Sequence, residues 1–247
     1  MQEAQPQAVI LVGGEGTRLR PALPAQPKAL APVAGRPFLA WLLVALERQG
    51  VRKVVLSTGY RAEAIEAFAE GARVEFGARL ELVCVRDPRP LGTGGALRNV
   101  AAAVRGDRVL VLNGDSYCPF DVRRLQRLHV AHSARASVWL ARVEDAGRFG
   151  AVTLAEDGRI TAFREKSASA GAGLVNAGIY LLERAALDEL PASAPLSLER
   201  EVFPQWLAAG GLYGLVGGEP LIDIGTPESY ALADEHVDWQ RLILAGA

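Results

Sequence analysis

The chain has 247 residues, of which 50% are hydrophobic and 22% are charged, enough apolar content for one large packed domain. Its 27 basic and 28 acidic residues leave a formal net charge of -1, and no basic run interrupts the balance. A protein that grips a nucleic-acid backbone would carry a basic surface, so nucleic acid is excluded as an expected partner.

Targeting and redox signals are also weak. Residues 1–7 lack the basic and apolar regions of a signal peptide, and the longest apolar run, residues 38–46, is too short to cross a bilayer. The two cysteines, Cys84 and Cys118, lie in apolar surroundings without CxxC spacing, which disfavours a disulfide or zinc site. We therefore expect a cytoplasmic protein with no membrane partner.

The first half of the chain alternates short apolar runs with helical patterns. Strands are expected at residues 8–12, 53–57, 80–85 and 108–112, and helices at 37–49, 61–70 and 96–104. Such alternation is typical of a Rossmann-like, doubly wound, mostly parallel sheet in a three-layer α/β arrangement.

The second half follows a different pattern. After a helix at residues 121–132, strand-like runs at 137–142, 150–154 and 160–164 predict a small antiparallel insertion. Further strands are expected at 178–182 and 212–216, and helices at 198–208 and 227–238. No linker or repeat divides the chain, which predicts a single domain over residues 1–247.

The segment after the first strand is rich in glycine. Gly13, Gly14 and Gly16 would let backbone N–H groups approach a phosphate chain, and Arg18 adds a guanidinium that can grip phosphate oxygens. The segment is neither a Walker A loop nor a dinucleotide fingerprint, because no Gly-Lys-Ser/Thr follows and Leu19 stands at the third glycine position. The alternative is a plain turn from strand to helix. Lys28, after Pro27, could fold over this loop, although alone it would read as a solvated lysine.

Two aspartates follow apolar runs. Asp115 comes just after the strand expected at 108–112, where doubly wound sheets bind ligands. Asp223 is flanked by apolar residues, where an ionised carboxylate is costly unless it is paired or binds a metal. Beside a triphosphate the pair would suit Mg²⁺, whereas each alone could be a helix cap or turn former.

Other segments are ambiguous when taken alone. Residues 90–97 form a second glycine-rich loop entering a helix, where bare backbone can approach a planar base or simply turn. Glu165 and Lys166 read as an exposed ion pair, and residues 176–180 as a strand entry. His129 and His132 have no acidic or cysteine partner nearby in sequence, which favours a packing or surface role.

Two motifs together carry a family resemblance. The runs Gly13-Gly14-Glu15-Gly16-Thr17-Arg18-Leu19-Arg20-Pro21 and Pro27-Lys28-Ala29-Leu30-Ala31-Pro32-Val33 resemble the GGxGTRLxP and PKxLxPV signature of sugar nucleotidyltransferases. The resemblance covers nearly the whole chain. It implies a nucleotide-binding half over about residues 1–120 and a sugar-binding half over about 121–247.

The resemblance also implies roles for individual residues. Catalysis would fall to Arg18, Lys28, Asp115, Lys166 and Asp223, with Mg²⁺ held by Asp115 and Asp223. The nucleoside triphosphate would be bound by Val12, Gly13, Gly14, Gly16, Thr17, Gly92, Thr93, Gly94, Asn113 and Gly114. The sugar phosphate would be bound by Gly150, Glu165, Asn176 and Gly178, with Lys166 on its phosphate. Ser167 stands where the family usually has proline.

The form of the motifs suggests the substrates. LGTGGAL is most similar to members that use GTP, and together with NGDS and LIDIGTPE in a compact chain it resembles heptose 1-phosphate guanylyltransferases. Mannose, glucose and N-acetylmuramic acid 1-phosphates with another nucleotide stay open, as do a catalytically silent nucleotide-sugar sensor and a homo-oligomer. A nicotinamide-dependent oxidoreductase is disfavoured, because residues 57–59 offer no acidic ribose ligand. Since the chain ends soon after its last expected helix, we expect no second catalytic domain.

Overall fold

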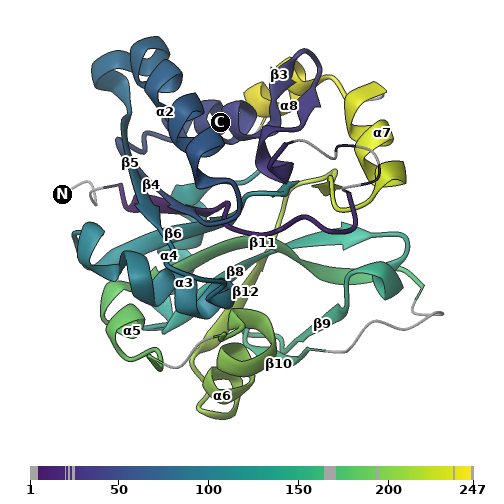
Figure 1. Cartoon of the computed structure of the whole chain (residues 1–247). Coiled ribbons are helices and arrows are strands. Elements are labelled where there is room, and N and C mark those ends of the chain that lie inside the picture. Colours follow the sequence, from purple (N-terminus) through teal and green to yellow (C-terminus); the bar gives the residue numbers. More distant parts are fainter. Residues whose placement is uncertain are drawn as a thin grey trace.

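The structure is a computed structural model that describes residues 5–19, 21, 23, 26–163, 171–192, 195–235 and 237–245. A nine-stranded sheet lies between two layers of helices (Figure 1). Its main order is β10-β9-β11-β6-β1-β4-β5, with β8 beside β11 and β12 beside β8. The described residues contain no helix that combines the length and apolar character needed to cross a membrane.

The parallel part of the sheet confirms the four strands expected in the first half. They are β1 (Gln7–Leu11), β4 (Lys53–Thr58), β5 (Glu81–Arg86) and β6 (Arg108–Asn113). From β1 the chain moves to one side through β4 and β5, then crosses to the other side with β6. This reversal beside β1 is the switch point at which open parallel sheets form a ligand-binding crevice.

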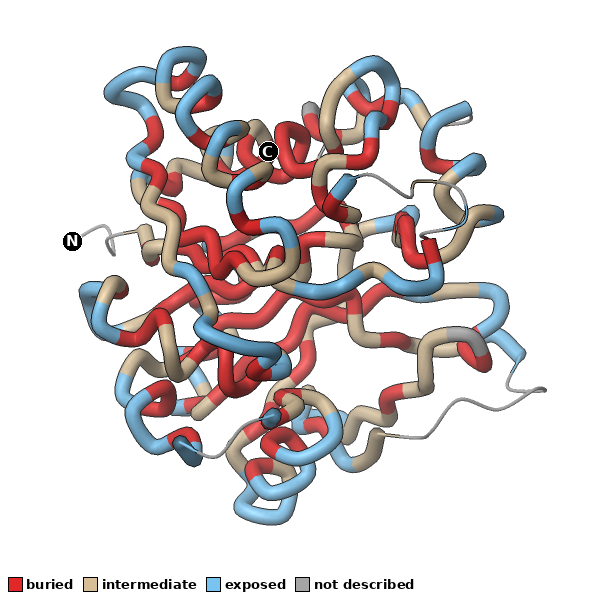
Figure 2. Tube along the Cα trace, in the orientation of Figure 1, coloured by how far each residue is buried: buried red, intermediate tan, exposed pale blue. Residues whose placement is uncertain are grey.

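The central strands are buried on both faces. Along β1, Ile10 joins one hydrophobic core and its neighbour Val9 the other, because successive side chains of a strand point to opposite faces. Figure 2 shows these strands as the most buried part of the chain. The first core includes residues from α1 (Phe38–Arg48), α2 (Ala62–Phe76) and α8 (Trp239–Ala245), and the second from α3 (Gly92–Val100), α5 (Arg184–Asp188) and α6 (Phe203–Ala208).

The antiparallel strands extend the main sheet. They are β8 (Ala136–Val143), β9 (Ala151–Leu154), β10 (Ile160–Phe163) and β11 (Gly173–Glu183), with β12 (Leu212–Val216) running parallel to β8. β11 is longer than the strand expected at 178–182 and pairs with β6, β8 and β9. A register shift between Asn176 and Ile179 lets this one strand serve both regions.

Several helices differ in extent from the sequence prediction. α2 continues past residue 70 because Ala72 and Phe76 prolong its buried face. The helix expected at 198–208 is a π-helical turn, η5 (Leu198–Val202), followed by α6. The helix expected at 227–238 is α7 (Pro227–Glu235), and α8 starts anew because Asp238 accepts a hydrogen bond from the Arg241 N–H at 3.0 Å. The remaining long helix, α4 (Val122–Ala131), is capped by Asp121 as expected for its start.

Short elements were not anticipated. They are the strand pairs β2 (Pro32–Val33) with β3 (Arg36–Pro37) and β7 (Ser116–Tyr117) with β13 (Ile222–Asp223), and the 3-10 turns η1 (Lys28–Leu30), η2 (Gly77–Arg79), η3 (Ala101–Ala103) and η4 (Ala146–Arg148). Two-residue strands carry no detectable periodicity, which explains their absence from the prediction.

An aromatic cluster packs α8 against α1. Trp239 of α8 is 1% exposed, stacks on Trp41 with ring centroids 5.7 Å apart, and meets Phe38 edge-on at 5.5 Å. Its Nε1–H donates to the Ala233 carbonyl at 2.9 Å, so its one polar atom is satisfied.

Truncating this side chain should therefore destabilise the fold. We expect Trp239→Ala to lower the free energy of unfolding by about 3–5 kcal/mol, because it leaves a cavity among packed rings. Urea unfolding monitored by circular dichroism measures the change. Val74→Ala, at a site 85% exposed on α2, is the control and should change stability by less than about 0.5 kcal/mol. A Trp239→Ala protein as stable as wild type would show that α8 is not part of the core.

Candidate active site

A cavity of about 710 Å³ opens at the carboxyl ends of β1, β4, β5 and β6. This is the position predicted by the reversal of strand order beside β1. The residues that line the cavity are Leu11, Val12, Gly13, Gly14, Glu15, Gly16, Thr17, Arg18, Lys28, Ala29, Ser57, Gly59, Tyr60, Asp87, Pro88, Arg89, Pro90, Leu91, Gly92, Thr93, Ala96, Asn113, Gly114, Asp115 and Gly225.

The first glycine loop lies along one wall of this cavity. A side chain at Gly13 would press on the Gly59 backbone at 3.2 Å, and the Tyr60 N–H donates to the Gly13 carbonyl at 3.0 Å. Gly14 is different, because a Cβ there would meet no atom within 4 Å. Gly13 thus closes the loop against β4, whereas Gly14 presents bare backbone to open space.

Lys28 folds over the same loop, as its motif suggested. Its Nζ lies 2.8 Å from Oδ2 of Asp115, and its side chain is only 11% exposed. A Cβ added at Gly16, where φ is +59°, would lie 3.1 Å from the Cβ of Lys28. Arg18 also lines the cavity. The structure therefore brings two cations and one carboxylate to the mouth of the glycine loop.

The two aspartates are brought together by the short strand pair β7 and β13. Asp223 pairs in register with Ser116, and the Ile224 N–H donates to the Asp115 carbonyl at 3.0 Å. Asp223 Oδ1 accepts the Gly225 N–H at 2.9 Å. Asp115 and Gly225 line the cavity, while Asp223 lies directly beside them. The described residues hold no group of three or more potential His, Cys, Asp or Glu metal ligands.

The second glycine loop forms the first turn of α3, so the helix expected at 96–104 starts at Gly92. A Cβ on Gly92, at φ +72°, would collide with the Leu196 carbonyl, and one on Gly94 would press on the Leu196 side chain at 3.0 Å. Gly92 and Thr93 line the cavity, whereas Gly94 faces Leu196. These glycines therefore serve close packing of the wall as well as access to the cavity.

Of the residues expected on the sugar side, Gly178 lies close to Asp115, and Asn176 is hydrogen-bonded to Gly178. Gly178, at φ +77°, has its Cα side against the Ser116 hydroxyl and the Asn113 side chain, at 2.7 and 2.9 Å from an added Cβ. The Gly178 N–H donates to Asn176 Oδ1 at 2.8 Å. Gly150, at φ +88°, immediately precedes β9. Gly150, Asn176 and Gly178 are not among the residues that line the cavity. Glu165 and Lys166 lie outside the described residues.

Sequence reasoning missed Asp87, which lines the cavity at the end of β5. Its Oδ1 accepts from Asn99 Nδ2 at 2.9 Å, and partial burial raises the pKa of this carboxyl above its ordinary value. The signal was available, because Asp87 follows a strand as Asp115 does.

The packing role expected for histidine fits the structure at His129. His129 is buried, with ring nitrogens 2.9 Å from Ser137 Oγ and 3.0 Å from Glu183 Oε1, and it does not line the cavity. Its acidic neighbour is 54 residues away, too far for sequence inspection to pair them. Cys84 and Cys118 are both free thiols.

Comparisons with known proteins agree with this geometry. A family model described as nucleotidyl transferase matches residues 7–239. The chain is 40% identical over 233 residues to mannose-1-phosphate guanylyltransferase of Mycobacterium tuberculosis, covering 93% of this chain but 64% of that protein, less than two thirds of its length. It is 32% identical over 234 residues to D-glycero-alpha-D-manno-heptose 1-phosphate guanylyltransferase of Aneurinibacillus thermoaerophilus, covering 94% of this chain and 98% of that protein.

Among solved structures, HddC from Yersinia pseudotuberculosis superposes with a TM-score of 0.81 at 29% identity, covering 93% of this chain and 98% of HddC. A complex of the same protein with GMP-PN superposes with a TM-score of 0.80. These superpositions confirm the expected fold class.

The Asp87 carboxyl should make stability depend on pH. Since its folded pKa is raised, the unfolded chain loses this proton first, and folding loses stability as pH rises from the ordinary aspartate value, about 4, through the raised value. An asparagine side chain cannot ionise, so Asp87→Asn does not lose stability in this way. The free energy of unfolding of the variant, relative to that of wild type, should therefore rise between the two pKa values and stay constant at higher pH. Urea midpoints between pH 3 and 7 measure the trend. Asp107→Asn, at an exposed position, is the matched control. A constant difference between Asp87→Asn and wild type across the range would contradict the assignment.

Proposed function

The chain belongs to the nucleotidyl transferase family, and on that premise we propose that it joins GTP to a sugar 1-phosphate, forming a GDP-sugar and releasing pyrophosphate. The observation that carries this proposal is the meeting of Arg18, Lys28 and Asp115 at the open backbone of the glycine loop. Cations and bare N–H groups suit a triphosphate, and a carboxylate among them suits a divalent cation.

The sugar phosphate needs little chemical activation. Its second pKa is about 6, so at neutral pH it is largely dianionic and attacks the α-phosphorus of the nucleotide without a general base. The bond to the α-phosphorus forms as the bond to the departing pyrophosphate breaks. The chain's contribution is to position both phosphates and to neutralise their charge: Arg18 and Lys28 bind the triphosphate, and Lys166 is assigned to the sugar phosphate.

The residues present fit Mg²⁺. The ion favours oxygen ligands, with one or two carboxylates beside phosphate oxygens and water. Asp115 lines the cavity, and backbone pairing places Asp223 next to it. We assign both carboxylates to the metal, which when bound would withdraw charge from the phosphates.

Asp87 favours guanine as the base. The Watson–Crick edge of guanine carries two adjacent donors, N1–H and the N2 amino group, which together match the two oxygens of a carboxylate. Adenine would present an acceptor to the same group. Asp87 lies on the cavity wall close to Gly13 and the second glycine loop, with Oδ2 3.2 Å from the Cβ position of Gly13. The guanylyltransferase relatives agree with this choice.

We propose a heptose 1-phosphate as the sugar substrate. The heptose 1-phosphate guanylyltransferase relative is matched over 98% of its own length, whereas the mannose-1-phosphate guanylyltransferase relative is matched over 64%. Mannose 1-phosphate is the second candidate, because the mannose-specific relative has the higher identity, 40%.

The first test is a substrate panel. Purified protein with Mg²⁺ should release pyrophosphate from GTP and a heptose 1-phosphate faster than from ATP, UTP, CTP or dTTP, and faster than with mannose, glucose or N-acetylmuramic acid 1-phosphate. Asp87→Asn should lower kcat/KM for GTP by roughly ten- to a hundredfold, since a charge-assisted hydrogen bond contributes about 1.5–3 kcal/mol, and should affect ATP little. Nucleotide-sugar binding without pyrophosphate release for any pair would favour a silent sensor instead.

The second test concerns the metal. Asp115→Asn and Asp223→Asn should each reduce kcat by more than about a hundredfold, because losing a metal ligand costs about 3 kcal/mol or more in the barrier. Mn²⁺ binding, followed by electron paramagnetic resonance in the presence of GTP, should weaken in parallel. Asp121→Asn, which changes the cap of α4 away from the cavity, is the control for a change of charge alone. Near-normal turnover for either site variant at saturating Mg²⁺ would remove that residue from the metal site.

A further inference from the structure

A line of side-chain hydrogen bonds runs behind the cavity wall, from the second glycine loop to the bulge of β11. It involves Thr93, Glu199, Tyr180 and Asn176. Asn176 shapes the bulge and Thr93 lines the cavity, whereas Glu199 and Tyr180 are not among the residues that line the cavity.

The line begins at the nucleotide side. Thr93 Oγ1 donates to Glu199 Oε2 at 2.8 Å and accepts the Leu198 N–H at 2.8 Å. Two backbone hydrogen bonds connect the same two segments. The Gly94 N–H donates to the Leu196 carbonyl at 2.9 Å, and the Leu196 N–H donates to the Leu91 carbonyl at 2.8 Å. The start of η5 and the second glycine loop are therefore held as one unit.

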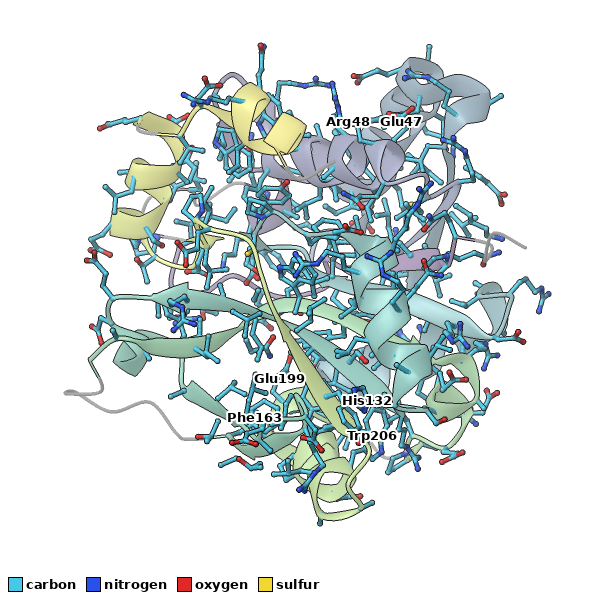
Figure 3. All side chains as sticks on the ribbon, turned by 180° about the vertical axis from the view of Figure 1, so that it is seen from behind. Glu47, Arg48, His132, Phe163, Glu199 and Trp206 are labelled. Carbon is cyan, nitrogen blue, oxygen red and sulfur yellow. The ribbon has the colours of Figure 1, made fainter. Side chains whose placement is uncertain are left out.

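Glu199 carries the line to β11. Its other oxygen, Oε1, accepts from the Tyr180 hydroxyl at 3.3 Å. Tyr180 is fully buried and packs edge-on against Phe203 with ring centroids 5.2 Å apart. Burial raises the pKa of Tyr180 well above its ordinary value, so its hydroxyl keeps the proton that it donates. Phe203 also contacts the rings of Phe163 and Trp206. Figure 3 shows these two residues in the same half of the molecule as Glu199.

The line ends at the bulge beside the aspartate site. Asn176 Nδ2 donates to the Tyr180 hydroxyl at 2.8 Å, which turns Asn176 Oδ1 toward the Gly178 N–H. The orientation of the Asn176 amide, and with it the form of the bulge, thus depends on Tyr180. Gly178 in turn packs on Asn113 and Ser116, on either side of Asp115.

We infer that Glu199 and Tyr180 are positioning residues that couple the nucleotide loop around Thr93 to the β11 bulge at 176–178, so that each substrate site depends on the other. The substrates in this inference come from the proposed function, whereas the line of hydrogen bonds is observed independently of it. Glu199 Oε2 also accepts from the Ser197 hydroxyl at 3.2 Å. Removing the Thr93 hydroxyl nevertheless takes the acceptor from the Leu198 N–H, and removing the Tyr180 hydroxyl takes the acceptor from the Asn176 amide.

Two isosteric variants test the coupling, each through its effect on the KM of the substrate bound at the other end of the line. Thr93→Val changes the nucleotide side, yet it should raise the KM for sugar phosphate as well as for GTP by about three- to tenfold. Tyr180→Phe changes the buried sugar side and should raise the KM for GTP by a similar factor. The double variant should lose little more than either single variant, because both break one line. Thr161→Val and Tyr213→Phe, which make the same chemical changes outside the line, should leave both KM values unchanged.

Amide hydrogen exchange of the free protein gives a second measurement that needs no substrate. In Thr93→Val, amides at 176–178 should exchange faster than in wild type, and in Tyr180→Phe those at 92–95 should do so. If the wild-type protein turns over no substrate pair, the proposed function fails while the exchange data still decide the coupling. The inference is overturned if each variant alters only its own loop, in exchange and in KM.

Discussion

The site depends on how closely the ends of three parallel strands approach one another beside β1. Gly59 lies against the Gly13 carbonyl, and Gly114 against the Leu11 carbonyl, with an added Cβ at 2.7 and 2.6 Å respectively. Real side chains cannot occupy such distances, so only glycine lets the loops after β1, β4 and β6 meet. The cavity, the reach of Lys28 to Asp115 and the exposed backbone at Gly14 all follow from that approach.

β11 is the second organising element. By pairing with β6 through residues 179–183 and with β8 and β9 through its earlier part, it carries a bulge to Asn113 and Ser116, at the edge of the cavity. Gly178 of this strand thus comes close to Asp115 through the sheet itself. The parallel and antiparallel strands therefore share continuous backbone hydrogen bonds through β11.

The sequence predicted the parallel strands, the three layers and the residues around the first glycine loop, because buried strands and glycine motifs leave local signals. It did not predict the pairing of β7 with β13 that joins Asp115 to Asp223, since two-residue strands have no period. It also did not predict that Gly92 and Gly94 of the second glycine loop pack on Leu196, about a hundred residues away, although Gly92 and Thr93 line the cavity. Tertiary contacts of that range leave no trace in a local pattern, and Asp87 was missed only because it stands outside a familiar motif.

The contacts of the last helices have a consequence for how the chain is made. Trp239 completes the core around Phe38 and Trp41, the Tyr230 hydroxyl donates to the Pro32 carbonyl at 2.6 Å, and Asp234 accepts the Ala34 N–H at 2.7 Å. Contacts so distant in sequence form slowly, because a long loop must close before they are gained. During synthesis, the first β-α units would emerge with one face of α1 uncovered until residues 230–243 leave the ribosome. Phe38 and Trp41 of α1 therefore gain their Trp239 partner only when synthesis is nearly complete, and until then the apolar surface that they expose favours aggregation.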